Sequence, residues 1–203
     1  DANAATLAEL HAGAFKGCNT AVLITLGTGV GGGLILGGRM FNGGMGNGVE
    51  LGHMILNHYG DICSCGNVGC IETLCTATWL IQQGRKAIVE HFNSMIYTEA
   101  NGDMENVTAR LVIDCARAGD SIAQDIFKRY VDSLGSVVAS FINLLDPEVI
   151  ALGGGVSLAG EFLLEPLRAN VASKVLYKKY GSIVSACLGN DAGIIGAAML
   201  YKN

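Results

Sequence analysis

The segment AVLITLGTGVGGGLILGG, residues 21–38, combines two apolar runs with seven glycines and contains no charged residue. It is long enough to cross a bilayer as a helix, but each glycine in a helix interior costs about 1 kcal/mol relative to alanine. A membrane helix is therefore not expected, and we expect no membrane partner. The pattern instead predicts a strand at residues 21–26, a glycine loop at 27–33 and a second strand from Leu34.

The flanking sequence predicts a single domain of mixed α/β class, with neither a repeat nor a linker. The expected elements are helices at residues 2–14, 121–146, 158–170 and 192–201, strands at 148–152 and 182–187, and a strand turn at Gly37 and Gly38. The apolar residues of the longest helix recur on one helical face. They are Leu134, Val137, Val138, Phe141, Ile142 and Leu145.

Composition and charge exclude several classes of protein. Half of the 203 residues are hydrophobic and 15% are charged, which suits a globular domain. The net charge of -5 and the absence of a Lys/Arg run argue against a nucleic-acid partner. Seven cysteines, an odd number, are unlike a secreted disulfide framework. We expect a cytoplasmic protein with reduced thiols.

The glycine loop meets only part of a known pattern. Gly27, Gly29 and Gly32 satisfy G-x-G-x-x-G, but a dinucleotide site requires a helix directly after the loop, and here a strand follows. A Walker loop is excluded because no Lys-Ser/Thr pair follows the glycines. Two interpretations stay open, a turn whose N–H groups and Thr28 hydroxyl bind phosphate, or a tight hairpin without a ligand. The glycine run at residues 153–155 is equally ambiguous.

The segment CSCGNVGCIE, residues 63–72, is more specific. Cys63, Cys65 and Cys70 supply three thiolates, and a closed tetrahedral zinc site needs a fourth ligand, either His53 or His58. The alternative is a coincidental group of reduced thiols. We expect a structural zinc site.

Four motifs in this order and spacing resemble the ROK family (repressors, open reading frames and sugar kinases), and within it the bacterial ATP-dependent glucokinases. They are DANA from residue 1, LITLGTGVGGG from residue 23, ELGH from residue 50 and CSCGNVGCIE from residue 63. The resemblance implies an actin-like, ribonuclease-H-like ATPase fold. Because no D-x-G-x-T phosphate motif precedes Asp1, we expect residues 1–203 to form the C-terminal lobe, with a zinc-braced loop, and to be inactive in isolation.

The resemblance also implies a role for individual residues. Asp1 would be the catalytic base, and the sugar hydroxyls would contact Glu50, His53 and Glu72. The implied zinc ligands are His53, Cys63, Cys65 and Cys70. The phosphates of ATP, which brings Mg²⁺, would lie against Gly27, Thr28, Gly29 and Gly31, and its adenosine near Gly153, Gly154 and Gly155.

The implied function is phosphorylation of a hexose by ATP, with glucose converted to glucose 6-phosphate. Fructose, mannose, allose and N-acetylhexosamines stay open as substrates because Val49 stands where many family members have glycine. A sugar-responsive transcriptional repressor of the same family is the alternative, and Asp1 favours the kinase because a pure sensor has less use for a base. The resemblance further implies a homodimer.

Overall fold

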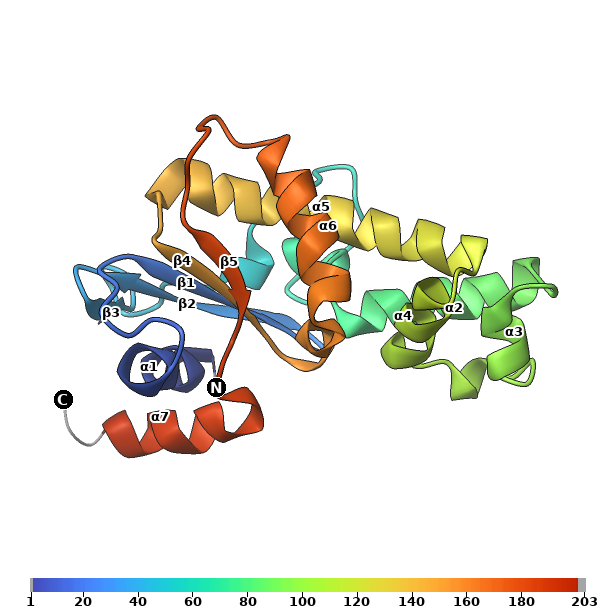
Figure 1. Ribbon diagram of the computed structural model, residues 1–203, viewed down its shortest axis with the longest axis horizontal. Helices are drawn as coiled ribbons and strands as arrows, with labels where there is room; N and C mark the ends of the chain where they lie inside the picture. Colours follow the sequence, from blue (N-terminus) through green and yellow to red (C-terminus); the bar gives the residue numbers. More distant parts are fainter. Residues whose placement is uncertain (1, 201–203) are drawn as a thin grey trace.

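A five-stranded mixed sheet lies at the centre of the computed structural model, which describes residues 2–200 (Figure 1). The strand order is β3-β2-β1-β4-β5. The first three strands are joined antiparallel, whereas β4 and β5 run parallel to β1. The strands are β1 (Ala21–Leu26), β2 (Val30–Leu36), β3 (Arg39–Phe41), β4 (Val149–Gly153) and β5 (Ser182–Ser185).

The predicted glycine loop is wrong in its second half, because β2 already begins at Val30. Gly31, a predicted phosphate contact, is a strand residue paired with Thr25 of β1. A Cβ atom at the two following positions would collide with Leu51 and Thr6. These glycines therefore mark close packing against the strand, and the turn itself is only residues 27–29.

Helices cover both faces of the sheet (Figure 1). On one face α1 (Ala2–Ala12) and α7 (Ala192–Leu200) lie side by side, and a small core around Phe15 and Leu23 fills the space beneath α1. The larger core lies on the opposite face, under α5 and α6. That face carries α5 (Ser121–Leu145) and α6 (Glu161–Ala172).

The long helix α5 confirms the periodicity seen in the sequence. Asp120 caps its first turn by accepting a hydrogen bond from Ala123 N at 2.8 Å, and Asp146 ends it in a left-handed conformation, φ 44°, before Pro147. Five of the six residues expected on its apolar face are buried, and Leu145 is partly buried.

Three helices that the sequence analysis did not predict form a lobe at one end of α5 (Figure 1). They are α2 (Ala77–Glu90), α3 (Met95–Glu99) and α4 (Ala109–Arg117). Short 3₁₀ turns complete the fold, namely η1 (Leu51–His53), η2 (Ile71–Thr73), η3 (Met104–Asn106), η4 (Gly155–Ala159) and η5 (Gly189–Asp191). Within residues 2–200, no helix combines the length and apolarity that crossing a bilayer would require.

Candidate functional site

His53 and three cysteines converge in one cluster, as the sequence predicted. Their ligand atoms all lie within 4.8 Å of one another. Cys63 Sγ is 3.6 Å from His53 Nδ1, and Cys65 Sγ is 3.7 Å from Cys70 Sγ. Around a tetrahedral zinc, Zn–S bonds of about 2.3 Å and Zn–N bonds of about 2.0 Å place neighbouring ligands roughly 3.5–3.8 Å apart. The four side chains therefore fit zinc in chemistry and in spacing.

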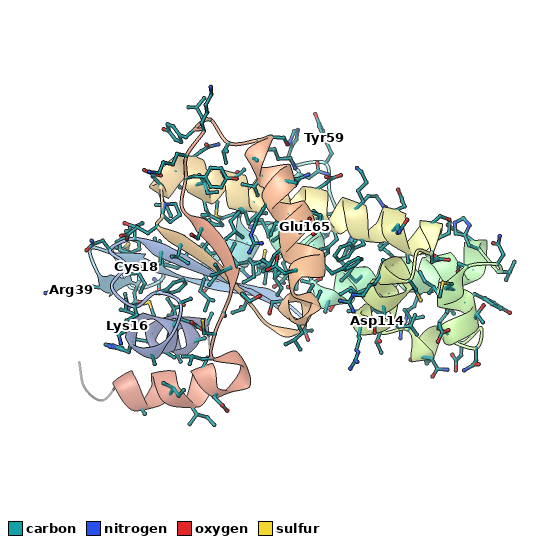
Figure 2. The ribbon with its side chains drawn as sticks, in the orientation of Figure 1. Lys16, Cys18, Arg39, Tyr59, Asp114 and Glu165 are labelled. Atoms are coloured by element: carbon teal, nitrogen blue, oxygen red, sulfur yellow. The ribbon has the colours of Figure 1, made fainter. Side chains whose placement is uncertain are left out.

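The rival histidine takes no part in the cluster. His58 is exposed, and its ring centroid lies 3.8 Å from that of Tyr59. Tyr59 itself is 85% exposed and projects outward from the fold (Figure 2). His53, and not His58, is therefore the histidine that the structure brings together with the three cysteines.

Two turns return Cys70 to the other ligands. Gly66 and Gly69 both have positive φ, 91° and 74°, which is why glycine suits these positions. The turns are held by Cys63 N, which donates to Asn67 O at 2.8 Å, and by hydrogen bonds from residues 56 and 57 to Gly69 O. These turns bring Cys70 back toward Cys63 and Cys65.

The pKa values of two thiols in the cluster are shifted in opposite directions. The pKa of Cys63 is lowered to about 7, chiefly by a hydrogen bond from the backbone of Cys65, with His53 contributing. Burial raises the pKa of the Cys70 thiol to about 12. Coordination deprotonates a thiol outright, so a cation would bring both sulfurs to the thiolate form.

Glu72 lies next to this cluster and reaches across to the sheet. It is half-buried on η2, where Oε2 accepts a hydrogen bond from Val30 N at 3.1 Å. Its other oxygen, Oε1, accepts from Ser64 Oγ at 3.2 Å. The sequence predicted Glu72 as a sugar contact but missed Ser64, whose only signal was its place between two of the cysteines.

The turn at residues 27–29 is fastened to the start of α2. Gly27 O accepts a hydrogen bond from Ala77 N at 2.8 Å, and Thr28 O accepts from Thr78 Oγ1 at 3.1 Å. Thr76 caps α2 by accepting from Trp79 N at 3.0 Å. These threonines were also missed, although Thr76 directly before an apolar run is a recognisable helix-start signal.

The second glycine run lies beside the first. Gly153 ends β4 next to Thr25 of β1, and the carboxyl ends of these parallel strands share one edge of the sheet. Gly154 has a φ of 81°, and a Cβ atom there would lie 2.5 Å from Leu26 O. Both glycine runs therefore meet at the edge where open α/β sheets bind ligands.

Two cavities flank the start of α2 at this edge. A polar cavity of about 420 Å³ is lined by Thr28, Cys63, Ser64, Glu72 and Thr76, among others. A second cavity, of about 470 Å³, lies between the first turn of η4 and α4. Its lining includes Ala77, Gly155, Val156, Arg110 and Arg117.

Of the three predicted sugar contacts, Glu72 lines the polar cavity, whereas Glu50 and His53 do not. Glu50 is exposed directly before η1, and its side chain does not line this cavity. The predicted catalytic base, Asp1, lies outside the described residues.

Comparison with known proteins places the chain in a family. It matches the ROK family over residues 1–203. The chain belongs to the ROK family. It is 40% identical over 204 residues to a glucokinase of Thermotoga maritima, a match that covers 100% of this chain and 64% of that protein. The chain thus spans less than two thirds of that relative.

The solved structures support the same assignment. A ROK family glucokinase from Streptomyces griseus, in complex with glucose and AMPPNP, matches with a TM-score of 0.90 and 31% identity, over 98% of this chain and 65% of that one. The predicted actin-like ATPase fold is confirmed. The repressor Mlc of Escherichia coli is 27% identical over 202 residues, covering 98% of this chain and 48% of the repressor. The ROK family therefore supplies both kinases and regulators among the relatives of this chain.

Proposed function

We propose that the protein carrying this chain transfers a phosphoryl group from ATP to a hexose, with glucose as the first candidate. The observation that carries this proposal is the polar cavity at which the 27–29 turn, Glu72 and the cysteine–histidine cluster meet. Glucokinase relatives at 30–40% identity and the family membership support it.

The sugar would be held by Glu72, His53 and Glu50, of which Glu72 lines the polar cavity. Each hexose hydroxyl is both donor and acceptor, so carboxylates that accept and an imidazole that donates can fix its orientation. Zinc on His53 Nδ1 and the three sulfurs would hold the imidazole ring in place, leaving its other nitrogen for the sugar. With four protein ligands such a site is closed, which makes the metal structural.

The nucleotide would lie along the edge where the two glycine runs meet. Backbone N–H groups of residues 27–29 and the Thr28 hydroxyl can donate to phosphate oxygens. The adenosine would occupy the cavity beside Gly155, on the other side of the start of α2. Phosphoryl transfer depends mainly on positioning and charge neutralisation, so these residues would orient ATP, and Mg²⁺ bound to it would neutralise charge.

Asp1 would accept the proton of the attacking hydroxyl, and its substitution tests the proposal. In the full-length protein, Asp1→Asn should lower kcat by about 10²–10⁴, because loss of a positioned general base typically costs this much. Sugar affinity and zinc content should change little, since the substitution preserves size and hydrogen-bonding capacity. Steady-state kinetics with glucose and ATP, together with glucose titration, would separate the two effects.

A sugar-responsive regulator is the second candidate, favoured by the similarity to Mlc. Such a protein would bind glucose without forming glucose 6-phosphate in the presence of ATP and Mg²⁺. That result, or an Asp1→Asn variant that keeps most of the wild-type kcat, would contradict the kinase proposal.

A further inference from the structure

Glu72 connects two parts of the site that the sequence motifs present separately. One carboxylate oxygen accepts from Val30 N at the end of the 27–29 turn, and the other accepts from Ser64 between two cluster cysteines. Cys63 Sγ lies 3.9 Å from the same oxygen that Ser64 contacts. The side chain therefore touches both the metal-binding segment and the phosphate-binding turn.

The contact with the turn is close. A Cβ atom at Gly29 would lie 2.7 Å from Glu72 Oε2, so any residue larger than glycine would displace the carboxylate. On its other side the turn is fastened to Ala77 and Thr78. Movement of Glu72 therefore removes one of the two supports of this turn.

The position of Glu72 is in turn set by the cluster. Cys70 directly precedes η2, and its carbonyl oxygen accepts from Thr73 N at 3.0 Å and from Thr73 Oγ1 at 2.8 Å. The hydroxyl of Ser64 is placed by the cysteines on either side of it. A cation that fixes the three sulfurs would therefore also fix Ser64, which holds one oxygen of the Glu72 carboxylate, and the start of η2, which carries Glu72.

We propose that Glu72 is a positioning residue that couples metal binding in the cluster to the conformation of residues 27–30, and through it to phosphate binding. The link to the turn follows from the contacts above, and the effect on phosphate rests on the proposed function. Coupling between two binding sites is reciprocal, so bound nucleotide would also tighten metal binding. Typical couplings change affinity about 5-fold to 150-fold.

Amide hydrogen exchange tests the structural part of this proposal. In the wild-type chain, removing zinc with a chelator should speed exchange in residues 27–33, where Val30 N loses its acceptor. Glu72→Ala should show fast exchange there even with zinc bound. With zinc bound, Ser64→Ala should exchange at a rate between those of the wild type and Glu72→Ala. Gln82→Ala is the matched control, because Gln82 lines the same cavity and forms none of these hydrogen bonds.

Titration with ADP, without sugar, tests the effect on phosphate. Zinc removal should weaken ADP binding by roughly fivefold or more in the wild type. In Glu72→Ala binding should be weak in both states, and Gln82→Ala should behave as the wild type.

Four outcomes bear on the proposal. Unchanged exchange at residues 27–33 after zinc release would overturn the coupling, and so would a uniform increase that includes β4. If exchange responds as expected but the zinc-loaded wild type binds no ADP, the link through Glu72 stands and the proposed nucleotide site fails. An equal ADP affinity with and without zinc overturns the coupling to phosphate.

Discussion

Gly154 and Gly155 are neighbours in one glycine run, yet the structure requires glycine at only one of them. Gly154 adopts a left-handed φ of 81° and packs against the backbone of Leu26. Gly155 starts η4, and a Cβ atom there would meet nothing within 4 Å. The first glycine therefore serves the fold, whereas the second leaves room in the adjoining cavity.

Alanine substitutions should separate these two roles. Gly154→Ala should lower the free energy of unfolding by about 2 kcal/mol, because it adds left-handed strain and a backbone clash. Gly155→Ala should change it by less than about 0.5 kcal/mol while weakening ATP binding, since the new methyl group enters the cavity proposed for adenosine. Urea unfolding and nucleotide titration would measure both. Equal losses of stability would contradict this distinction.

Val49 has an unusual backbone conformation that the sequence did not predict. The resemblance to the ROK family indicated that Val49 stands where many members have glycine. The structure places it at φ 71°, a conformation that β-branched residues rarely adopt. Strain is therefore stored directly before Glu50, a predicted sugar contact.

At the level of elements, predictions succeeded where the signal was local. The apolar period of α5 and the strands β1 and β4 were predicted from spacing and composition alone. The start of β2 was not, because glycine is depleted in strands and three successive glycines read as a loop. The reason for glycine there is the approach of Thr6 and Leu51, which lie far from β2 in sequence and which no local pattern reveals.

This close approach can be tested in β2. Gly33→Ala should lower the free energy of unfolding by about 1–3 kcal/mol, because the methyl group would collide with Thr6 and push α1 from the sheet. Gly44→Ala is the control, since nothing lies within 4 Å of a Cβ atom there and its φ is not in the left-handed region. Thermal and urea unfolding would compare the two variants. Equal free energies of unfolding for the two variants would show that the packing of α1 does not depend on glycine at position 33.

At the scale of the whole molecule, the sequence predicted which residues form the site better than it predicted the contacts between them. The cluster ligands follow from spacing within one short segment, and His53 was one of two histidines considered. Contacts between segments distant in sequence account for the rest of the site. They give Glu72 its connecting role, position the threonines at the start of α2 and form the two cavities. Those contacts form only when the sheet and the helical lobe come together.

Metal analysis of the chain purified without added zinc tests the central claim most directly. The account predicts close to one equivalent of zinc, because the four ligand atoms already lie within 4.8 Å of one another. Cys65→Ser should lose the metal, whereas Cys187→Ser, which removes another exposed cysteine outside the cluster, should retain it. A wild-type chain without zinc, or equal zinc in both variants, would contradict the claim that this cluster is a structural metal site.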